Sequence, residues 1–275
     1  MAEPALSACA DIVRRFDPHL FATALFAAEP ARERLMTLYA FDIELSRAAG
    51  TVASSDTGPL IAAMRVQWWR DLVAEAGDGA EPRAHEVAAP LAALIAEGAL
   101  TRADLDALID ARDREIDGEP DRAGFTSWAD ARFGALTRLA AMLLSGTAPK
   151  AAHPAGQALG HAFALRTATP MAREGRCLLP DLPAGATSAL ARNEASGALI
   201  AALAEQAQEG LSALKAARAT GAPRAAVPAF LPLWRAERTL VAVASRPEDV
   251  LCGLPQVSPA RRAAALGWRA LTGRW

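Results

Sequence analysis

The segment Gly156–Pro180, GQALGHAFALRTATPMAREGRCLLP, decides the predicted architecture because it is the least generic stretch of the chain. Gly156, Gly160 and Ala164 recur every four residues, so they share one face of a helix and leave that face bare. Another backbone, or a flat apolar ligand, can approach such a face closely. Arg166 comes near the end of this helix, where the helix dipole favours a cation. The pattern predicts a closely packed or ligand-lining helix.

The composition predicts helices along the rest of the chain as well. Its 275 residues include 69 alanines and are 52% hydrophobic, but only 5% are aromatic. Alanine has the highest helix propensity, whereas β-sandwiches and barrels favour β-branched and aromatic residues. The apolar content is also too high for a disordered chain.

Charge and cysteine usage exclude several functional classes. The 29 Lys+Arg and 31 Asp+Glu residues nearly balance, so there is no general basic footprint for nucleic acid. Cys9, Cys177 and Cys252 are far apart, form no CxxC motif and suggest a reducing compartment. The first 17 residues contain acidic residues and no apolar h-region, so we expect no secretory signal. No uncharged apolar run reaches the roughly 18 residues of a membrane span. We expect a cytoplasmic protein, with peripheral contact at the inner membrane as an alternative.

Hydrophobic periodicity predicts one all-α domain of about ten helices over residues 1–275, less regular from about 222, where prolines accumulate. Thr101 and Asp104 form a loose capping box. Ser127 is expected to cap one helix, and Pro170 to stop another. The longer predicted helices span about 30–50, 59–77, 84–97, 101–118, 128–144, 154–169 and 187–219.

Two helices carry residues that can be read as chemistry or as ordinary packing. Tyr39, Phe41, Asp42 and Glu44 lie on the first, but the two acids are two residues apart and point to different faces. An amphipathic core helix is therefore favoured over a metal-binding one. On the second helix Arg65, Trp68, Trp69 and Arg70 can stack on a ligand or pair with an anion. The favoured alternative has one tryptophan packed inward and the other at the rim.

The charged segment DLDALIDARDREID contains two DxxxD pairs. On a helix Asp106 and Asp110 share a face, as do Asp113 and Asp117, so each pair can hold Mg²⁺. Interleaved arginines are instead typical of a solvated helix with many ion pairs, and this interpretation is favoured.

The chain resembles the squalene/phytoene synthase family over roughly residues 15–185. Tyr39–Phe41 looks like the start of that family's first aspartate-rich helix, and residues 127–146, SWADARFGALTRLAAMLLSG, resemble its central helix. The best match is Ala158–Pro180, where Leu165-Arg166 and the motif Gly175–Pro180 align without a gap. The resemblance implies the all-α isoprenoid-synthase fold of head-to-head prenyl transferases.

The resemblance also places two acidic motifs whose carboxylates hold Mg²⁺ in the active enzymes. The corresponding positions here are Ser46, Arg47, Gly50, Thr167, Pro170 and Met171. None is acidic, and Arg47 puts a cation where a cation should bind. Departure of diphosphate needs neutralised charge, which metal ions normally supply. The resemblance therefore implies no catalytic residue, no metal and no cofactor.

A subgroup of the family departs from the motifs in the same way. The mitochondrial complex I assembly factor of squalene/phytoene-synthase type has a first motif similar to Ala40–Ser46, AFDIELS, and a segment similar to Met64–Arg70. Its charged helix is similar to LIDARDREID. The resemblance implies a non-catalytic protein that acts in respiratory complex I assembly or as an isoprenoid- or lipid-binding scaffold. Its ligand-cavity candidates are Tyr39, Phe41, Asp42, Arg65, Trp68, Trp69, Gly156, Gly160, Phe163, Arg166 and Arg176.

Two alternatives stay open at this point. One is an active Mg²⁺-dependent prenyl transferase that uses displaced acids such as Asp42, Glu44, Asp106 and Asp110, which would have to converge on one cavity. The other is a membrane-surface contact through residues 258–275, in which Arg261, Arg262, Arg269 and Arg274 with Trp268 and Trp275 suit a basic interfacial helix. A terminal helix packed against the rest of the chain is the favoured interpretation of this segment. The expected partners are respiratory-complex subunits or an isoprenoid or lipid chain, without nucleic acid.

Overall fold

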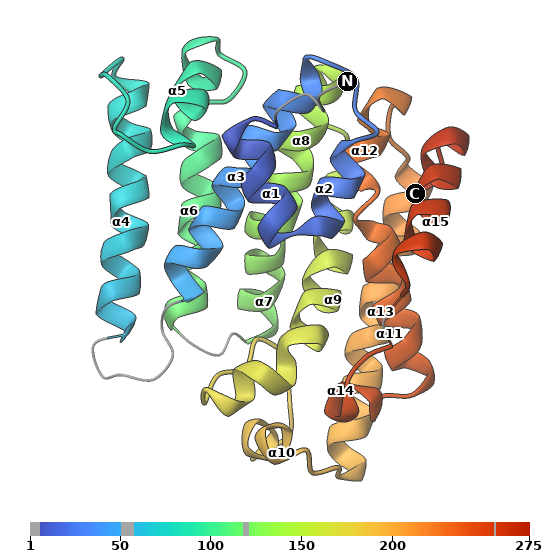
Figure 1. Ribbon diagram of the computed structural model, residues 1–275. Helices are drawn as coiled ribbons and strands as arrows, with labels where there is room; N and C mark the ends of the chain where they lie inside the picture. The colour runs from blue at the N-terminus through green and yellow to red at the C-terminus, as the bar shows by residue number, and fades with distance from the viewer. Residues whose placement is uncertain (1–5, 51–57, 118–120, 256) are drawn as a thin grey trace. The chain divides into compact units, whose positions relative to one another are not determined.

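The computed structural model describes residues 6–50, 58–117, 121–255 and 257–275, with the backbone alone at 114–117. These residues form α-helices and helical turns without a β-strand, so the all-α prediction is confirmed (Figure 1). The chain divides into two compact units. Unit 1 contains residues 1–116, 138–148 and 223–229, and unit 2 contains residues 117–137, 149–222 and 230–275. That residues 1–275 form a single domain stays a prediction.

Unit 1 is organised around α3, which is buried along most of its length. Helices α1, α2, α4 and α5 pack against it or against one another. Asp17 caps α2 by accepting hydrogen bonds from the amides of His19 and Leu20. The helices are α1 (Ala8–Phe16), α2 (Pro18–Ala24), α3 (Ala31–Ala49), α4 (Gly58–Gly77), α5 (Ala88–Ala96), α6 (Arg102–Asp117) and most of α8 (Ala135–Ser145).

Unit 2 is organised around α9, which contacts α7, α10, α11, α13, α14 and a π-helical turn. The π-helix directly follows α7. The elements of unit 2 are α7 (Arg122–Ala129), the π-helix (Asp130–Gly134), α9 (Ala152–Arg173), α10 (Ala186–Arg192), α11 (Gly197–Thr220), α13 (Leu233–Ser245), α14 (Asp249–Cys252) and α15 (Pro259–Thr272). The 3₁₀ turn Arg224–Ala226 and most of α12 (Val227–Phe230) belong to unit 1.

The bare face of α9 accommodates another backbone. A Cβ atom on Gly156 would lie 2.3 Å from the amide nitrogen of Gly134 and 3.2 Å from the carbonyl oxygen of Ala129. A Cβ atom on Gly160 would lie 2.6 Å from the Cβ atom of Ala129. The two glycines thus permit the close packing of α9 against the end of α7 and the π-helix.

Several predicted helix boundaries are correct and others are wrong. The capping box is confirmed, because Thr101 Oγ1 accepts from the amide of Asp104 and the Asp104 carboxylate accepts from the amide of Thr101. Ser127 was expected to cap a helix, but the helix begins at Arg122 and Asp121 caps it by accepting from the amide of Gly124. At the N-cap position an aspartate side chain accepts hydrogen bonds from the free backbone amides of the first turn as well as a serine side chain does.

The other corrections concern where helices end. Pro170 was expected to end a helix, yet it lies inside α9, which continues to Arg173. Proline removes one amide donor but does not prevent helical geometry when packing holds the chain on both sides. The predicted helix at 187–219 is two helices, because Asn193 takes a left-handed conformation with φ 56° and Ser196 caps α11. Such divisions give the described residues more helices than the ten or so expected.

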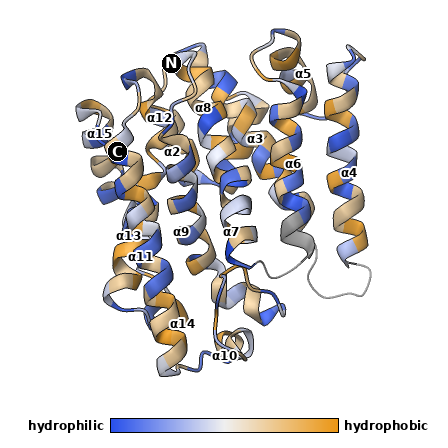
Figure 2. Cartoon of the chain, turned by 180° about the vertical axis from the view of Figure 1, so that it is seen from behind, coloured by the Kyte–Doolittle hydropathy of each residue, from blue (hydrophilic) through white to orange (hydrophobic). Residues whose placement is uncertain are grey.

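No helix in the described part of the chain is long and apolar enough to cross a membrane. Hydrophobic and hydrophilic residues are mixed along the long helices α4, α9 and α11 (Figure 2).

Candidate functional site

The first predicted motif region lies on α3 and is an internal part of unit 1. The side chains of Tyr39 and Phe41 are buried in the core. Burial raises the pKa of the Tyr39 phenol, and the negative charge of Asp42 adds to this effect. Asp42 is itself largely buried and is engaged by Arg112 of α6.

The Asp42–Arg112 ion pair joins α3 to α6 in the interior. The guanidinium of Arg112 donates to Asp42 Oδ1 at 2.5 Å and to the backbone oxygen of Asp42 at 3.2 Å. The Arg112 side chain is fully buried. Burying a charged guanidinium is energetically costly unless an opposite charge lies beside it. The Asp42 carboxylate is therefore needed to balance the charge of Arg112.

The three positions at the end of α3 provide no metal ligand. Ser46 donates its hydroxyl hydrogen to the Asp42 backbone oxygen one turn earlier, at 2.9 Å. Arg47 pairs with Glu44 at 2.5 Å, and its guanidinium lies 4.2 Å from the centre of the Phe16 ring on α1. Gly50 caps the end of the helix. Arg47 therefore helps hold α1 against α3 rather than facing a diphosphate.

The aromatic residues of α4 form a packed cluster with α3 and the segment before α5. Trp69 is buried and lies edge-on to Phe41, with ring centres 5.4 Å apart. Trp68 is partly exposed and contacts both Trp69 and His85. The expectation that one tryptophan packs inward and the other lies at the rim is confirmed. Arg65 lies on the exposed side of α4.

The carboxylates of α6 are engaged by arginines. Asp110 and Asp113 both accept hydrogen bonds from Arg70 of α4, at 2.6 and 2.9 Å. Asp106 pairs with Arg102 one turn earlier at 3.4 Å. The expected ion pairs are present on the exposed side of α6, but the expectation that the interleaved arginines are solvated is wrong for Arg112, which is fully buried beside Asp42. The Asp117 side chain lies outside the described residues.

The second predicted motif region lies near the end of α9 in unit 2. Thr167 donates its hydroxyl hydrogen to the backbone oxygen of Phe163 at 2.9 Å. Pro170 is exposed and Met171 is partly buried. Just beyond the helix, Arg176 pairs with Glu174 at 3.0 Å. These motif positions, too, lack a carboxylate.

Arg132 is a buried cation that sequence reasoning missed. The π-helix carries it, and its guanidinium lies 4.3 Å from the ring centre of Phe163 and 4.7 Å from that of Phe133. Arg166 approaches the Phe163 ring at 5.7 Å. Aromatic faces stabilise a guanidinium withdrawn from water. The only hint in the sequence is an arginine flanked by apolar residues in SWADARFGAL.

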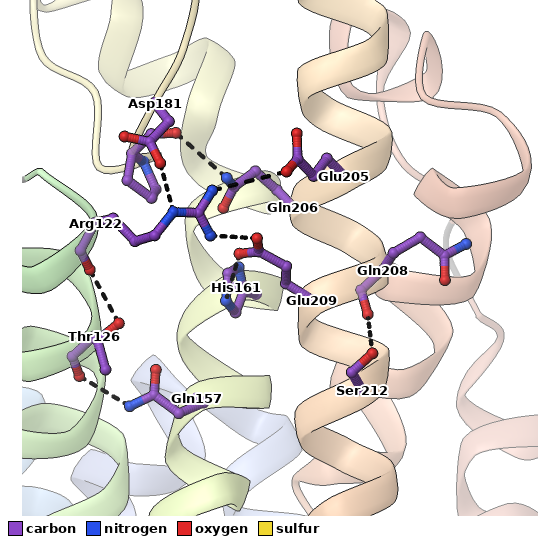
Figure 3. Close-up of polar contacts among 11 residues, drawn as sticks. Arg122, Thr126, Gln157, His161, Asp181, Glu205, Gln206, Gln208, Glu209 and Ser212 are labelled. Atoms are coloured by element: carbon purple, nitrogen blue, oxygen red, sulfur yellow. Dashed lines mark hydrogen bonds and ion pairs between the residues drawn. The ribbon is translucent and has the colours of Figure 1, made fainter.

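A second missed feature is a polar network that links α7, the loop after α9, and α11 (Figure 3). Arg122 donates to Asp181 at 2.6 Å and to Glu209, and it lies 3.8 Å from Glu205. Gln206 donates to the backbone oxygen of Pro180 at 3.3 Å. Because these partners are distant in sequence, no local pattern indicates them.

His161 of α9 lies beneath this network. Its Nε2 atom is 3.8 Å from Glu209 Oε2, and its ring packs against Phe125 at 4.7 Å. Burial lowers the pKa of His161 to about 4, because the nearby Glu209 carboxylate does not offset the loss of hydration. The histidine is therefore neutral in the folded protein near neutral pH.

The lowered pKa of His161 predicts an acid-dependent loss of stability. Below pH 6.5 the unfolded chain binds a proton that the folded chain refuses until about pH 4, so folding stability falls through this window. At pH 5 the group should cost about 2 kcal/mol of unfolding free energy relative to neutral pH. Urea unfolding of His161→Gln should lack this component. The exposed His153 provides the control, and if His153→Gln removed the same component the assignment to His161 would be wrong.

Among the residues that the structure describes, no three His, Cys, Asp or Glu side chains are grouped so that they can hold a metal ion. Among these described residues, Arg112 is buried beside the Asp42 carboxylate and Arg132 is buried beside the rings of Phe133 and Phe163. A family model of squalene/phytoene synthases matches residues 13–269. The chain belongs to the squalene/phytoene synthase family.

Solved members with similar structures share little sequence with this family member. The structure of a dehydrosqualene synthase in complex with a ligand matches with a TM-score of 0.79 and 13% identity, covering 94% of this chain and 93% of that one. Squalene synthase HpnC from Alicyclobacillus acidocaldarius matches with a TM-score of 0.70 and 16% identity, covering 87% and 92%. The complex of TcSQS with E5700 matches with a TM-score of 0.68 and 13% identity, covering 94% and 84%. No curated protein matches the chain.

These likenesses confirm the isoprenoid-synthase fold, but the motif positions of this squalene/phytoene synthase family member do not fit a divalent cation. Mg²⁺ requires oxygen ligands, usually carboxylates. The two hydroxyls available, of Ser46 and Thr167, donate to their own helix backbones. Arg47 supplies a guanidinium at a motif position and cannot act as a ligand of a metal ion.

Proposed function

We propose that the protein is a non-catalytic member of the squalene/phytoene synthase family that acts in the assembly of respiratory complex I. The observation that carries the proposal is the set of residues at the six motif positions and the contacts that they make. Arg47 is committed to Glu44 and Phe16, and none of the six positions bears a carboxylate. The similarity of Ala40–Ser46 to the first motif of the mitochondrial assembly factor supports the specific role.

The alternative of an active enzyme with displaced acids has little support in the geometry. Asp42 neutralises the buried Arg112, and Glu44 pairs with Arg47. Asp106 and Asp110 pair with arginines of α6 and α4. A carboxylate that already balances an arginine offers less negative charge to a metal ion.

The ligand that we propose for the scaffold is an isoprenoid or lipid chain, and the partners are subunits of the respiratory complex. Either role needs the helical framework but not the metal. Among the ligand candidates, Phe163 and the arginines beside it, Arg132 and Arg166, have suitable chemistry, whereas Phe41 is fully buried in the core against Trp69.

The proposal predicts that the purified protein does not turn over prenyl diphosphates. Incubated with Mg²⁺ and farnesyl or geranylgeranyl diphosphate, it should form no hydrocarbon product above a protein-free control, because nothing neutralises the leaving diphosphate. Product analysis by mass spectrometry measures this, with a dehydrosqualene synthase as the positive control. Turnover on the scale of about 1 per second, ordinary for enzymes, would overturn the proposal.

Deletion of the gene separates the two roles in one strain. We expect lower complex I activity in membranes and unchanged carotenoid and hopanoid content. Complementation with the double variant Asp106→Asn/Asp110→Asn should restore complex I activity as well as the wild-type gene does, because the proposed role assigns no metal ion to these two carboxylates. Loss of isoprenoid products with intact complex I would favour the enzyme instead.

A further inference from the structure

Helix α15 exposes large apolar side chains on its outward face. The Trp268 side chain is 65% exposed and that of Leu271 is 76% exposed. The two residues are three apart, so they lie on the same side of the helix, and Ala264, one turn before Trp268, is exposed beside them. On the opposite side Leu266 is buried. We call Ala264, Trp268 and Leu271 the outward face of α15.

Contacts with α13 and α11 hold α15 in one orientation. Arg269 of α15 donates to Glu237 of α13 at 2.8 Å, and Arg218 of α11 pairs with the same carboxylate at 2.6 Å. Arg218 also donates to the backbone oxygen of Trp275 at 2.6 Å, and the Trp275 ring stacks on Phe230. These contacts within unit 2 fix which side of α15 faces outward.

The charged residues of α15 itself and of the segments directly before and after it are all arginines. No aspartate or glutamate occurs from Val250 to Trp275, whereas four arginines do: Arg261, Arg262, Arg269 and Arg274. Arg261 lies on the first turn of α15 and Arg274 follows its end, and both are exposed. The apolar residues are thus flanked at both ends of the helix by exposed cations.

From these observations we propose that the outward face of α15 binds the surface of a lipid bilayer with anionic head groups. Tryptophan has an apolar body and a polar N–H group, which suits the boundary between head groups and acyl chains. Leu271 enters the acyl region beside it, while Arg261 and Arg274 contact phosphate groups. The helix lies in the plane of the interface and does not span it.

Another exposed apolar face in the molecule lacks this charge pattern and provides a matched control. On α4 the side chains of Leu60 and Met64 are 64% and 65% exposed, about as much as that of Trp268. Along α4, Arg65 is exposed next to Met64, and the exposed Asp71 follows on the same helix, so charges of both signs occur there. If exposure of apolar residues alone caused membrane binding, α4 would contribute as much as α15.

Vesicle co-sedimentation of the full chain tests the proposal. We expect binding to vesicles of phosphatidylcholine mixed with phosphatidylglycerol, little binding to phosphatidylcholine alone, and weaker binding at high salt. Trp268→Ser/Leu271→Ser and Arg261→Gln/Arg274→Gln should each weaken binding roughly tenfold or more. Each arginine at the lipid surface, and each apolar side chain inserted into the bilayer, contributes on the order of 1 kcal/mol to binding. Leu60→Ser/Met64→Ser should bind as the wild type does.

Three results would overturn the proposal. They are equal binding to neutral and anionic vesicles, unchanged binding by the α15 variants, and an equal loss in the α4 control. A second copy of the chain could cover the outward face of α15 instead of a bilayer, and light scattering after gel filtration tests for such a dimer. If Trp268→Ser/Leu271→Ser converted a dimer to a monomer without changing vesicle binding, the face would be a self-association surface. Thermal unfolding of each variant verifies that these surface substitutions leave the fold intact.

Discussion

Replacing Arg112 by methionine should lower the free energy of unfolding by about 3–5 kcal/mol. The arginine side chain is fully buried, and its guanidinium balances the largely buried carboxylate of Asp42. Methionine fills much of the same volume but leaves Asp42 charged in the interior without its partner, and this uncompensated charge causes most of the loss. Urea unfolding monitored by far-ultraviolet circular dichroism measures the effect.

The exposed Arg34–Glu97 pair serves as the control for this experiment. The arginine side chain is 43% exposed and the glutamate side chain 51%, so Arg34→Met should cost no more than about 1 kcal/mol. The double variant Asp42→Leu/Arg112→Met should recover part of the stability lost in Arg112→Met, since it removes both charges. A loss in Arg112→Met as small as that in Arg34→Met would show that the buried pair does not hold α3 and α6 together.

Adding one methyl group at Gly156 should destabilise the protein by about 2–3 kcal/mol, although alanine is the better helix former. The new Cβ atom would lie 2.3 Å from the nitrogen and 2.5 Å from the Cα atom of Gly134. Both are backbone atoms, so no side-chain rotation relieves the overlap and α9 must move away from the π-helix. The shift in the midpoint of urea unfolding of Gly156→Ala gives the magnitude.

Gly267→Ala is the matched control for the glycine prediction. Gly267 also lies inside a helix, α15, but a Cβ atom there would meet nothing within 4 Å. The same substitution should therefore stabilise the protein by up to about 1 kcal/mol, because only the helix propensity changes. Opposite signs at the two positions are the expected result, and equal signs would contradict the close packing of α9.

The comparison of particular helices shows which sequence signals were sufficient. The Thr101–Asp104 capping box was predictable because its hydrogen bonds join residues three apart. Pro170 misled because a proline inside a helix is tolerated when the helix is packed on several sides, as α9 is by its neighbours. Asn193 was a weak signal, since asparagine takes the left-handed conformation only in certain contexts.

For the candidate site, too, the sequence predicted some features and not others. The sequence showed which acids were missing, since that requires only the residues at Ser46, Arg47, Gly50 and their counterparts on α9. It did not show what the remaining charges do. Arg112 and Arg132 were missed because their partners lie on other elements, up to 70 residues away in sequence.

By itself the sequence determined the helical class, the close-packing face of α9 and the absence of carboxylates at the motif positions. These depend on composition, on the spacing of small residues within one helix and on residue identity, all of which are local. Only the tertiary structure decided that Asp42 neutralises a buried arginine, that Arg122 joins three elements through Asp181 and Glu209, and that Trp268 and Leu271 face outward. The physical reason is that burial and pairing of charge depend on which helices meet, and in this chain the partners are distant in sequence.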